Sequence, residues 1–206
     1  MNRHLFALVG ASLAAFMASP SLAQSVSEVD DAVEPQNTAG LPADLRPIDD
    51  ALVGGLMNNP TDLDWAHYGI GHELVVDESY PGGGAALRIA MGPAANDYAG
   101  GMNIPLLARV NSGERLTVGF YARTIESSAE NGMGKVKVRF QANREPYPGF
   151  GDTVLEIGSD WDWYEVTAVA ERALRRDGIV ALQFGLAEQT LEIGQAVVVR
   201  GPATVR

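Results

Sequence analysis

Residues 114–124, which read ERLTVGFYART, have the clearest strand pattern in the chain. Its apolar side chains fall on every second position, with Tyr121 and Arg123 among the residues between them. Residues 135–141, which read KVKVRFQ, repeat the pattern with lysine, arginine and glutamine on the polar side. A period of two is typical of strands that have one face on a core and one in water. Both stretches are therefore predicted to be half-buried β-strands.

Short runs of β-branched, aromatic and aliphatic residues recur from residue 51 onward, separated by clusters of Gly, Pro, Asn and Asp. Further strands are predicted at residues 73–76, 85–91, 98–104, 153–157, 163–169, 179–186 and 191–199. About eight to ten strands at this spacing predict an all-β protein, an antiparallel two-sheet β-sandwich or jelly roll. This domain is expected to cover residues 51–206, without an internal repeat or a second domain.

Residues 1–50 are expected to lie outside that domain. A basic start, an apolar run over residues 5–17 and small residues at Ser21 and Ala23 predict a signal peptide over residues 1–23. The protein would then be periplasmic or secreted. Residues 24–50 are rich in acidic residues and hold no aromatic residue, which predicts a disordered acidic leader.

The net charge of the chain excludes several classes of partner. The sequence has 26 acidic residues against 15 Lys and Arg, a formal net charge of −11. Nucleic-acid binding depends on basic residues that neutralise phosphates, so no nucleic acid is expected as a partner. No run after the first 23 residues approaches the roughly 18 apolar residues of a membrane span, so no membrane insertion is expected. Cysteine is absent, which excludes disulfides and a cysteine nucleophile.

No motif assigns a catalytic residue. No serine stands in a Gly-x-Ser-x-Gly turn, and His67 and His72 lack the helical spacing of a zinc motif. Paired carboxylates cleave glycosidic bonds, but spacing along a β-rich chain does not place two acids across a cleft. The sequence favours a protein without catalytic residues and leaves that question open. No cofactor is required, but a structural calcium ion is a candidate, with possible ligands at Asp62, Asp64, Asp77 and Glu192.

Aromatic and polar side chains on the predicted wet faces are the strongest functional signal. Tyrosine and tryptophan rings offer apolar platforms, and neighbouring amides and guanidinium groups orient a bound molecule. If the strands at 114–124 and 135–141 pair, they form one patch with a third strand; its residues are Tyr121, Arg123, Arg139, Gln141 and Gln183. Loop residues that could rim this patch are Trp65, His67, Tyr98 and Tyr147.

The segment 160–166, which reads DWDWYEV, holds two of the three tryptophans. Rings set among carboxylates suit a surface that stacks on sugars. The alternative is that Trp161 and Tyr164 are packing anchors at the start of a late strand. The strand pattern around the segment favours the second interpretation.

Four pieces of the chain resemble the galactose-binding-like jelly roll of carbohydrate-binding modules attached to bacterial xylanases and glucanases. They are Trp65 after residues 58–64, the strand at 114–123, the spacing of Trp161 and Tyr164, and the closing strand at 190–199. The resemblance covers roughly residues 52–200 and consists of the pattern of the strands and a few residues at matching positions.

The resemblance implies a jelly-roll sandwich that binds an oligo- or polysaccharide on a concave sheet face, without cleaving it. Two alternatives remain open. One is a structural or protein-interaction sandwich without a sugar site, which would have a protein partner. The other, which the sequence favours less, is a small polysaccharide-active enzyme.

Overall fold

The computed structural model describes residues 38–201, so the expected signal peptide and most of the expected leader lie outside the described residues. Ten strands follow one another in this part of the chain: β1 (Ala66–Tyr68), β2 (Gly71–Val76), β3 (Ala85–Met91), β4 (Gly101–Pro105), β5 (Arg115–Ser127), β6 (Gly134–Ala142), β7 (Gly149–Ile157), β8 (Asp162–Val169), β9 (Gly178–Gln183) and β10 (Gln189–Arg200). Short helical segments are η1 (Ala43–Leu45), α1 (Arg46–Ala51) and η2 (Asp97–Ala99).

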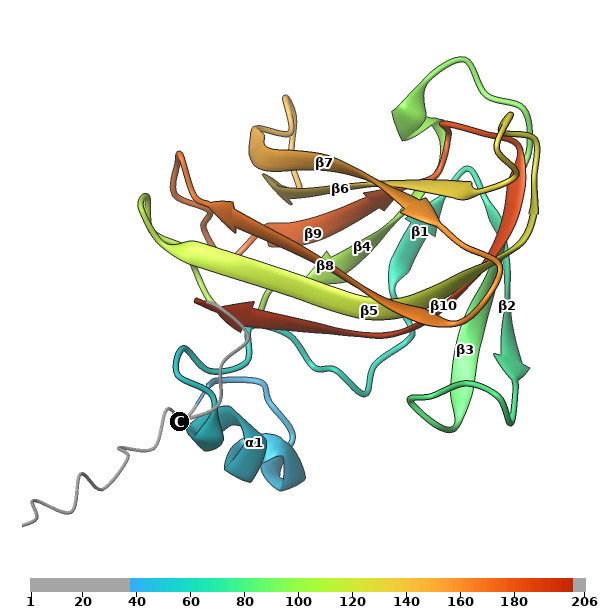
Figure 1. Cartoon of the computed structure of the whole chain (residues 1–206). Helices are drawn as coiled ribbons and strands as arrows, with labels where there is room; N and C mark the ends of the chain where they lie inside the picture. The colour runs from blue at the N-terminus through green and yellow to red at the C-terminus, as the bar shows by residue number, and fades with distance from the viewer. Residues whose placement is uncertain (1–37, 202–206) are drawn as a thin grey trace, which may run out of the picture. The chain divides into compact units, whose positions relative to one another are not determined.

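The strands form two five-stranded antiparallel sheets that face each other (Figure 1). The first sheet has the order β1-β4-β9-β6-β7, and the second has the order β2-β3-β10-β5-β8. The neighbours in each sheet are mostly distant in sequence, as in a jelly roll. This confirms the predicted fold class, an all-β antiparallel two-sheet sandwich.

The apolar faces of the two sheets enclose one core. The side chains that alternate inward on β5 are fully buried, including Phe120, and Phe140 on β6 lies opposite in the other sheet. Both belong to the same cluster of buried residues, together with Leu182 on β9 and Ile193 on β10. Period-two alternation thus placed the core side chains of the long strands correctly.

One expectation about the sheets is wrong. The strands at 114–124 and 135–141 correspond to β5 and β6, and these do not pair. β5 pairs with β8 and β10 in the second sheet, whereas β6 pairs with β7 and β9 in the first. The chain crosses from one sheet to the other between them, as jelly-roll connections do. The polar faces of β5 and β6 therefore lie on opposite sides of the sandwich.

Residues 38–50 differ from the expected disordered leader. Leu41 is buried against Leu56 and Val199, which belongs to β10. The fully buried carboxylate of Asp49 accepts hydrogen bonds from the backbone N–H of Leu56 (2.6 Å) and the hydroxyl of Thr38 (3.1 Å). Leu41 and the Asp49 carboxylate thus join residues 38–50 to the folded structure. The sequence does not show this, because a single leucine and a buried acid in a polar segment form no apolar pattern.

Candidate functional site

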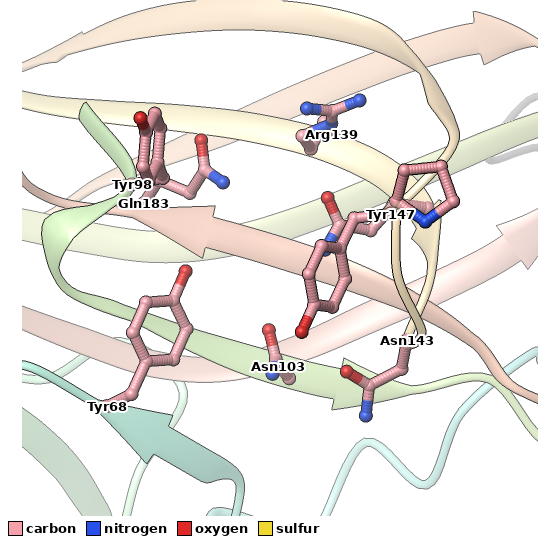
Figure 2. Close-up of a pocket in the computed structure, with 9 residues that line it drawn as sticks. Tyr68, Tyr98, Asn103, Arg139, Asn143, Tyr147 and Gln183 are labelled. Atoms are coloured by element: carbon pink, nitrogen blue, oxygen red, sulfur yellow. The ribbon is translucent and has the colours of Figure 1, made fainter. Parts of the chain in front are cut away.

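A cleft of about 470 Å³ lies on the outer face of the first sheet. It is lined by residues of β1, β4, β6 and β9, by η2 and by the loop between β6 and β7; these are Tyr68, Tyr98, Asn103, Arg139, Gln141, Asn143, Pro146, Tyr147 and Gln183. Its volume falls within the roughly 300–1,000 Å³ of small-molecule sites. Figure 2 shows the labelled side chains entering this space from several elements.

The register of the sheet explains why the face is hollow. Gly101 on β4 pairs with Gln183 on β9, and two residues further along Asn103 pairs with Ala181, which in turn pairs with Arg139 on β6. The small side chains of Gly101 and Ala181 thus alternate with polar ones across the floor. A Cβ atom at position 101 would lie 2.7 Å from the Tyr68 hydroxyl, so glycine is needed there for the tyrosine to fold over the sheet.

The floor of the cleft contains polar atoms that the protein does not satisfy. Asn103 Oδ1, Arg139 Nε and Gln183 Oε1 are buried and have no hydrogen-bond partner within the protein. They are three of the seven such side-chain atoms in residues 38–201, so the cleft holds nearly half of them. Buried polar atoms in folded proteins are almost always paired. Three unpaired atoms in one cleft therefore indicate that water or a ligand completes them.

Three tyrosines form the sides of the cleft. Tyr68 comes from β1, Tyr98 from η2 and Tyr147 from the β6–β7 loop, and their exposed fractions are 38%, 60% and 46%. In Figure 2 the rings of Tyr68 and Tyr147 rise from opposite sides of the floor. Burial raises the pKa of the Tyr68 hydroxyl, so this group stays protonated and can donate a hydrogen bond at neutral pH.

Ion pairs hold η2, and with it Tyr98, beside β6. Lys137 Nζ donates a hydrogen bond to Asp97 (2.7 Å) and also contacts Asp152 (3.1 Å). The hydrogen bond from Lys137 lowers the pKa of the Asp97 carboxyl, and the reciprocal contact with Asp97 raises the pKa of the lysine. Both groups therefore stay charged, which fixes the segment that carries Tyr98.

A bulge in β7 brings Asp152 to this place. Val138 pairs with Thr153 and Phe140 with Phe150, so two residues of β7 oppose the single residue Arg139 of β6. One of the two is Gly151, whose φ of 73° lies in the left-handed region that suits glycine. The extra residue turns Asp152 toward the β6 side chains on the outer face.

The loop between β6 and β7 presents Tyr147 in an uncommon backbone conformation. Its φ is 55°, and a non-glycine residue held there costs about 1–3 kcal/mol. The loop is fixed at both ends, because Asn143 N–H donates to the carbonyl of Asp177 (2.8 Å) and Ala142 N–H donates to that of Pro148 (3.0 Å). A strained aromatic residue on an anchored loop beside a cleft is a common feature of binding sites.

The structure brings together part of the predicted site. Arg139, Gln141, Gln183 and Tyr98 all line the cleft, and so does the predicted rim residue Tyr147. Four residues of the cleft are not predicted from the sequence: Tyr68, Asn103, Asn143 and Pro146. Period two could have placed Asn103 on the face of β4, but the three-residue strand β1, which carries Tyr68, is too short to show a pattern.

Trp65, Tyr121 and Arg123 lie elsewhere. Trp65 is only 2% exposed and belongs to the core, so it cannot rim the cleft. Tyr121 and Arg123 are on β5, hence on the second sheet. The single patch expected from β5 and β6 is therefore wrong, because the interior of the sandwich separates the two groups.

Tyr121 is part of an aromatic cluster on the second sheet. Its ring contacts Tyr80 and Trp163 with centroid distances of 6.1 and 5.1 Å, and Trp161 lies 4.9 Å from Tyr80. The guanidinium group of Arg123 lies 4.9 Å from the Trp161 ring centre. These rings pack on one another, which agrees with a structural role for the segment 160–166.

The acidic residues proposed for calcium are not gathered at one place in the described part of the chain. Glu192 is fully buried and pairs with Arg88 (2.7 Å) and Arg123 (2.6 Å), so two positive groups occupy the places of a metal ion. Asp62 accepts the N–H of Asp64 (2.9 Å) in a local turn. Within residues 38–201 no group of three or more His, Asp or Glu is arranged to hold a metal.

Comparisons with solved structures identify the architecture. The chain superimposes on a family 4 carbohydrate-binding module with a TM-score of 0.52 and 19% identity over 66% of this chain and 94% of the module. It superimposes on the second N-terminal cellulose-binding domain of Cellulomonas fimi β-1,4-glucanase C with a TM-score of 0.51 and 15% identity, covering 71% and 92% of the two chains.

A third similar structure is the xylan-binding CBM22-1 domain of Paenibacillus barcinonensis Xyn10C, with a TM-score of 0.50 and 10% identity over 73% of this chain and 97% of the domain. The chain has the fold of these carbohydrate-binding modules. The sequence matches no protein-family model and no curated protein. In the described part of the chain, no helix is long and apolar enough to cross a membrane.

Proposed function

We propose that this protein is an exported module that binds carbohydrate on the outer face of its first sheet, without cleaving it. The observation that carries the proposal is the group of unpaired polar atoms on Asn103, Arg139 and Gln183, set between exposed tyrosines. Sugar rings have apolar faces and a rim of hydroxyl groups. Hydroxyl groups donate and accept hydrogen bonds, so they can pair both the amide oxygens and the arginine N–H.

The tyrosines supply the other half of the recognition. An aromatic ring can cover the apolar face of a sugar, while its hydroxyl group hydrogen-bonds at the edge. Tyr68, Tyr98 and Tyr147 come from three separate elements and leave 38–60% of their surface exposed, so their rings remain available to a ligand. The fold of the similar structures, two of them cellulose- or xylan-binding domains, supports the same assignment.

The composition of the cleft supports binding without cleavage. None of its nine lining residues is aspartate or glutamate. Most glycosidases cleave with a pair of carboxylates that flank the scissile bond. The nearest acids on the face, Asp97 and Asp152, are held in ion pairs with Lys137.

Affinity gel electrophoresis against plant, algal and bacterial polysaccharides tests the proposal. At least one polymer should retard the wild-type protein, and Tyr98→Ala or Tyr147→Ala should weaken the retardation about tenfold. Trp163→Ala is the matched control, because Trp163 is 40% exposed but lies on the second sheet. Wild-type mobility that is unchanged by every polymer would refute carbohydrate binding.

Export is the second part of the proposal and rests on the N-terminal sequence. Mass determination of the protein recovered from its native host should give a chain that begins at Gln24. Recovery of the protein in the cytoplasm with its N-terminus intact would contradict it.

A further inference from the structure

The charge of the cleft is opposite to that of the protein. The chain has 26 acidic residues and a net charge of −11, yet the nine lining residues include one arginine and no acid. If charges were placed at random, acids would outnumber bases here as elsewhere. The remaining lining residues are neutral, so Arg139 sets the charge of the site.

Arg139 is neutralised only in part by the acids around it. Asp97 and Asp152 both pair with Lys137, at 2.7 and 3.1 Å. The ion pair of Arg139 is longer, 3.7 Å from its Nε to Asp152, and it is not a hydrogen bond. Lys137 thus makes the close contacts with both acids, and the buried Nε of Arg139 has no hydrogen-bond partner.

The guanidinium group of Arg139 is also held in place. A Cβ atom at position 149 would lie 2.7 Å from Nη2, so the group rests against the backbone where Gly149 begins β7. The arginine side chain is 23% exposed and opens to the cleft that it lines. A fixed, partly desolvated guanidinium group with a free donor is suited to bind a planar carboxylate.

We infer that the ligand is an acidic glycan, with the carboxylate of a uronic acid unit bound by Arg139. This inference rests on the proposed function, since the sugar rings would still lie between the tyrosines. The amides of Gln141 and Asn143, which also line the cleft, offer neutral donors for the second carboxylate oxygen and the adjoining hydroxyl groups. The absence of acids from the lining removes the repulsion that a polyanion would meet elsewhere on this surface.

The test compares each acidic polymer with its neutral counterpart. Isothermal titration of the full chain would use polygalacturonate, alginate and glucuronoxylan, each before and after reduction of its carboxyl groups to alcohols. The inference predicts at least tenfold tighter binding to the acidic form of one pair, because a charge-assisted hydrogen bond contributes that much. Arg139→Gln should reduce this affinity to that of the reduced polymer, and Arg139→Lys should restore only part of it.

The outcomes separate the two proposals. Equal or tighter binding of the reduced polymers, or of neutral glucans and xylans only, would overturn the acidic-glycan inference and leave carbohydrate binding intact. Binding of no polymer, acidic or neutral, would overturn both. The wild-type comparison holds even if an Arg139 variant fails to fold.

Discussion

The unpaired amide oxygen of Gln183 predicts that a stabilising substitution will weaken binding. Gln183 is 5% exposed and its Oε1 has no partner. A buried polar group without a partner costs about 1–3 kcal/mol. Methionine has nearly the same shape without the polar atoms. The substitution also removes the side-chain hydrogen bond between Gln183 and Tyr68, which offsets about 1 kcal/mol of the gain. Gln183→Met should therefore raise the free energy of unfolding by about 1 kcal/mol, while the affinity for the glycan falls.

Gln189 provides a matched control. It is 4% exposed, but its amide is fully paired: Oε1 accepts the N–H of Lys135 (2.7 Å), and Nε2 donates to the carbonyls of Lys135 (2.8 Å) and Phe184 (2.7 Å). At about 1 kcal/mol for each hydrogen bond, Gln189→Met should lower the free energy of unfolding by about 3 kcal/mol. The same substitution is thus expected to raise the free energy of unfolding at position 183 and to lower it at position 189.

Urea unfolding followed by tryptophan fluorescence measures both variants. For a chain of this length, 1 kcal/mol corresponds to about 2–4 °C in Tm, so thermal scans give an independent value. The slopes of the urea transitions should match that of the wild type, so that midpoints report stability alone. If Gln183→Met destabilises the protein as much as Gln189→Met does, then the Gln183 amide is already satisfied in the free protein. Its oxygen would then give no support for a ligand site.

Three further predictions concern the framework. Glu192→Gln should lower the free energy of unfolding by about 3 kcal/mol in urea titrations, because it leaves Arg88 and Arg123 beside a neutral group; an unchanged midpoint would contradict this. The pKa of Asp97 is lowered when folded, so its contribution to stability is complete above about pH 4 and is lost as the pH falls through the folded value. Asp97→Asn should therefore flatten the dependence of stability on pH in that acidic range, and an identical profile would refute the role of the pair. Asp49→Ala should lower the free energy of unfolding by about 1–3 kcal/mol and make α1 sensitive to limited proteolysis, because the carboxylate of Asp49 accepts buried hydrogen bonds. Protease resistance equal to that of the wild type would show that α1 packs without this carboxylate.

The sequence predicted the layers of the fold better than its connections. Alternation on β5 and β6 gave the correct inward faces, because one side of each strand contacts the core and the other contacts water. The pairing of strands depends on which edges meet in space, and no local pattern records that. Tyr121 and Arg139 were therefore assigned to one patch although they lie on opposite faces of the sandwich.

The cleft was predictable only in its regular part. Arg139, Gln141 and Gln183 stand on strands long enough to show which way their side chains point, and all three line the cleft. Tyr68 and Asn143 come from a three-residue strand and from a loop, where neighbours in space decide the direction of a side chain. Glu192 shows the same limit, since its role as a buried partner of two arginines depends on strand register.

Side-chain amide signals offer the most direct test of where the glycan binds. In a ¹⁵N-labelled sample titrated with the polymer that retards the protein most, we expect large shifts of the amide groups of Asn103 and Gln183. The amide signal of Gln189, whose hydrogen bonds are made within the protein, should stay unchanged. Shifts of the Trp161 and Trp163 indole signals, with the amide signals of Asn103 and Gln183 unchanged, would place the ligand on the second sheet and contradict binding in the cleft.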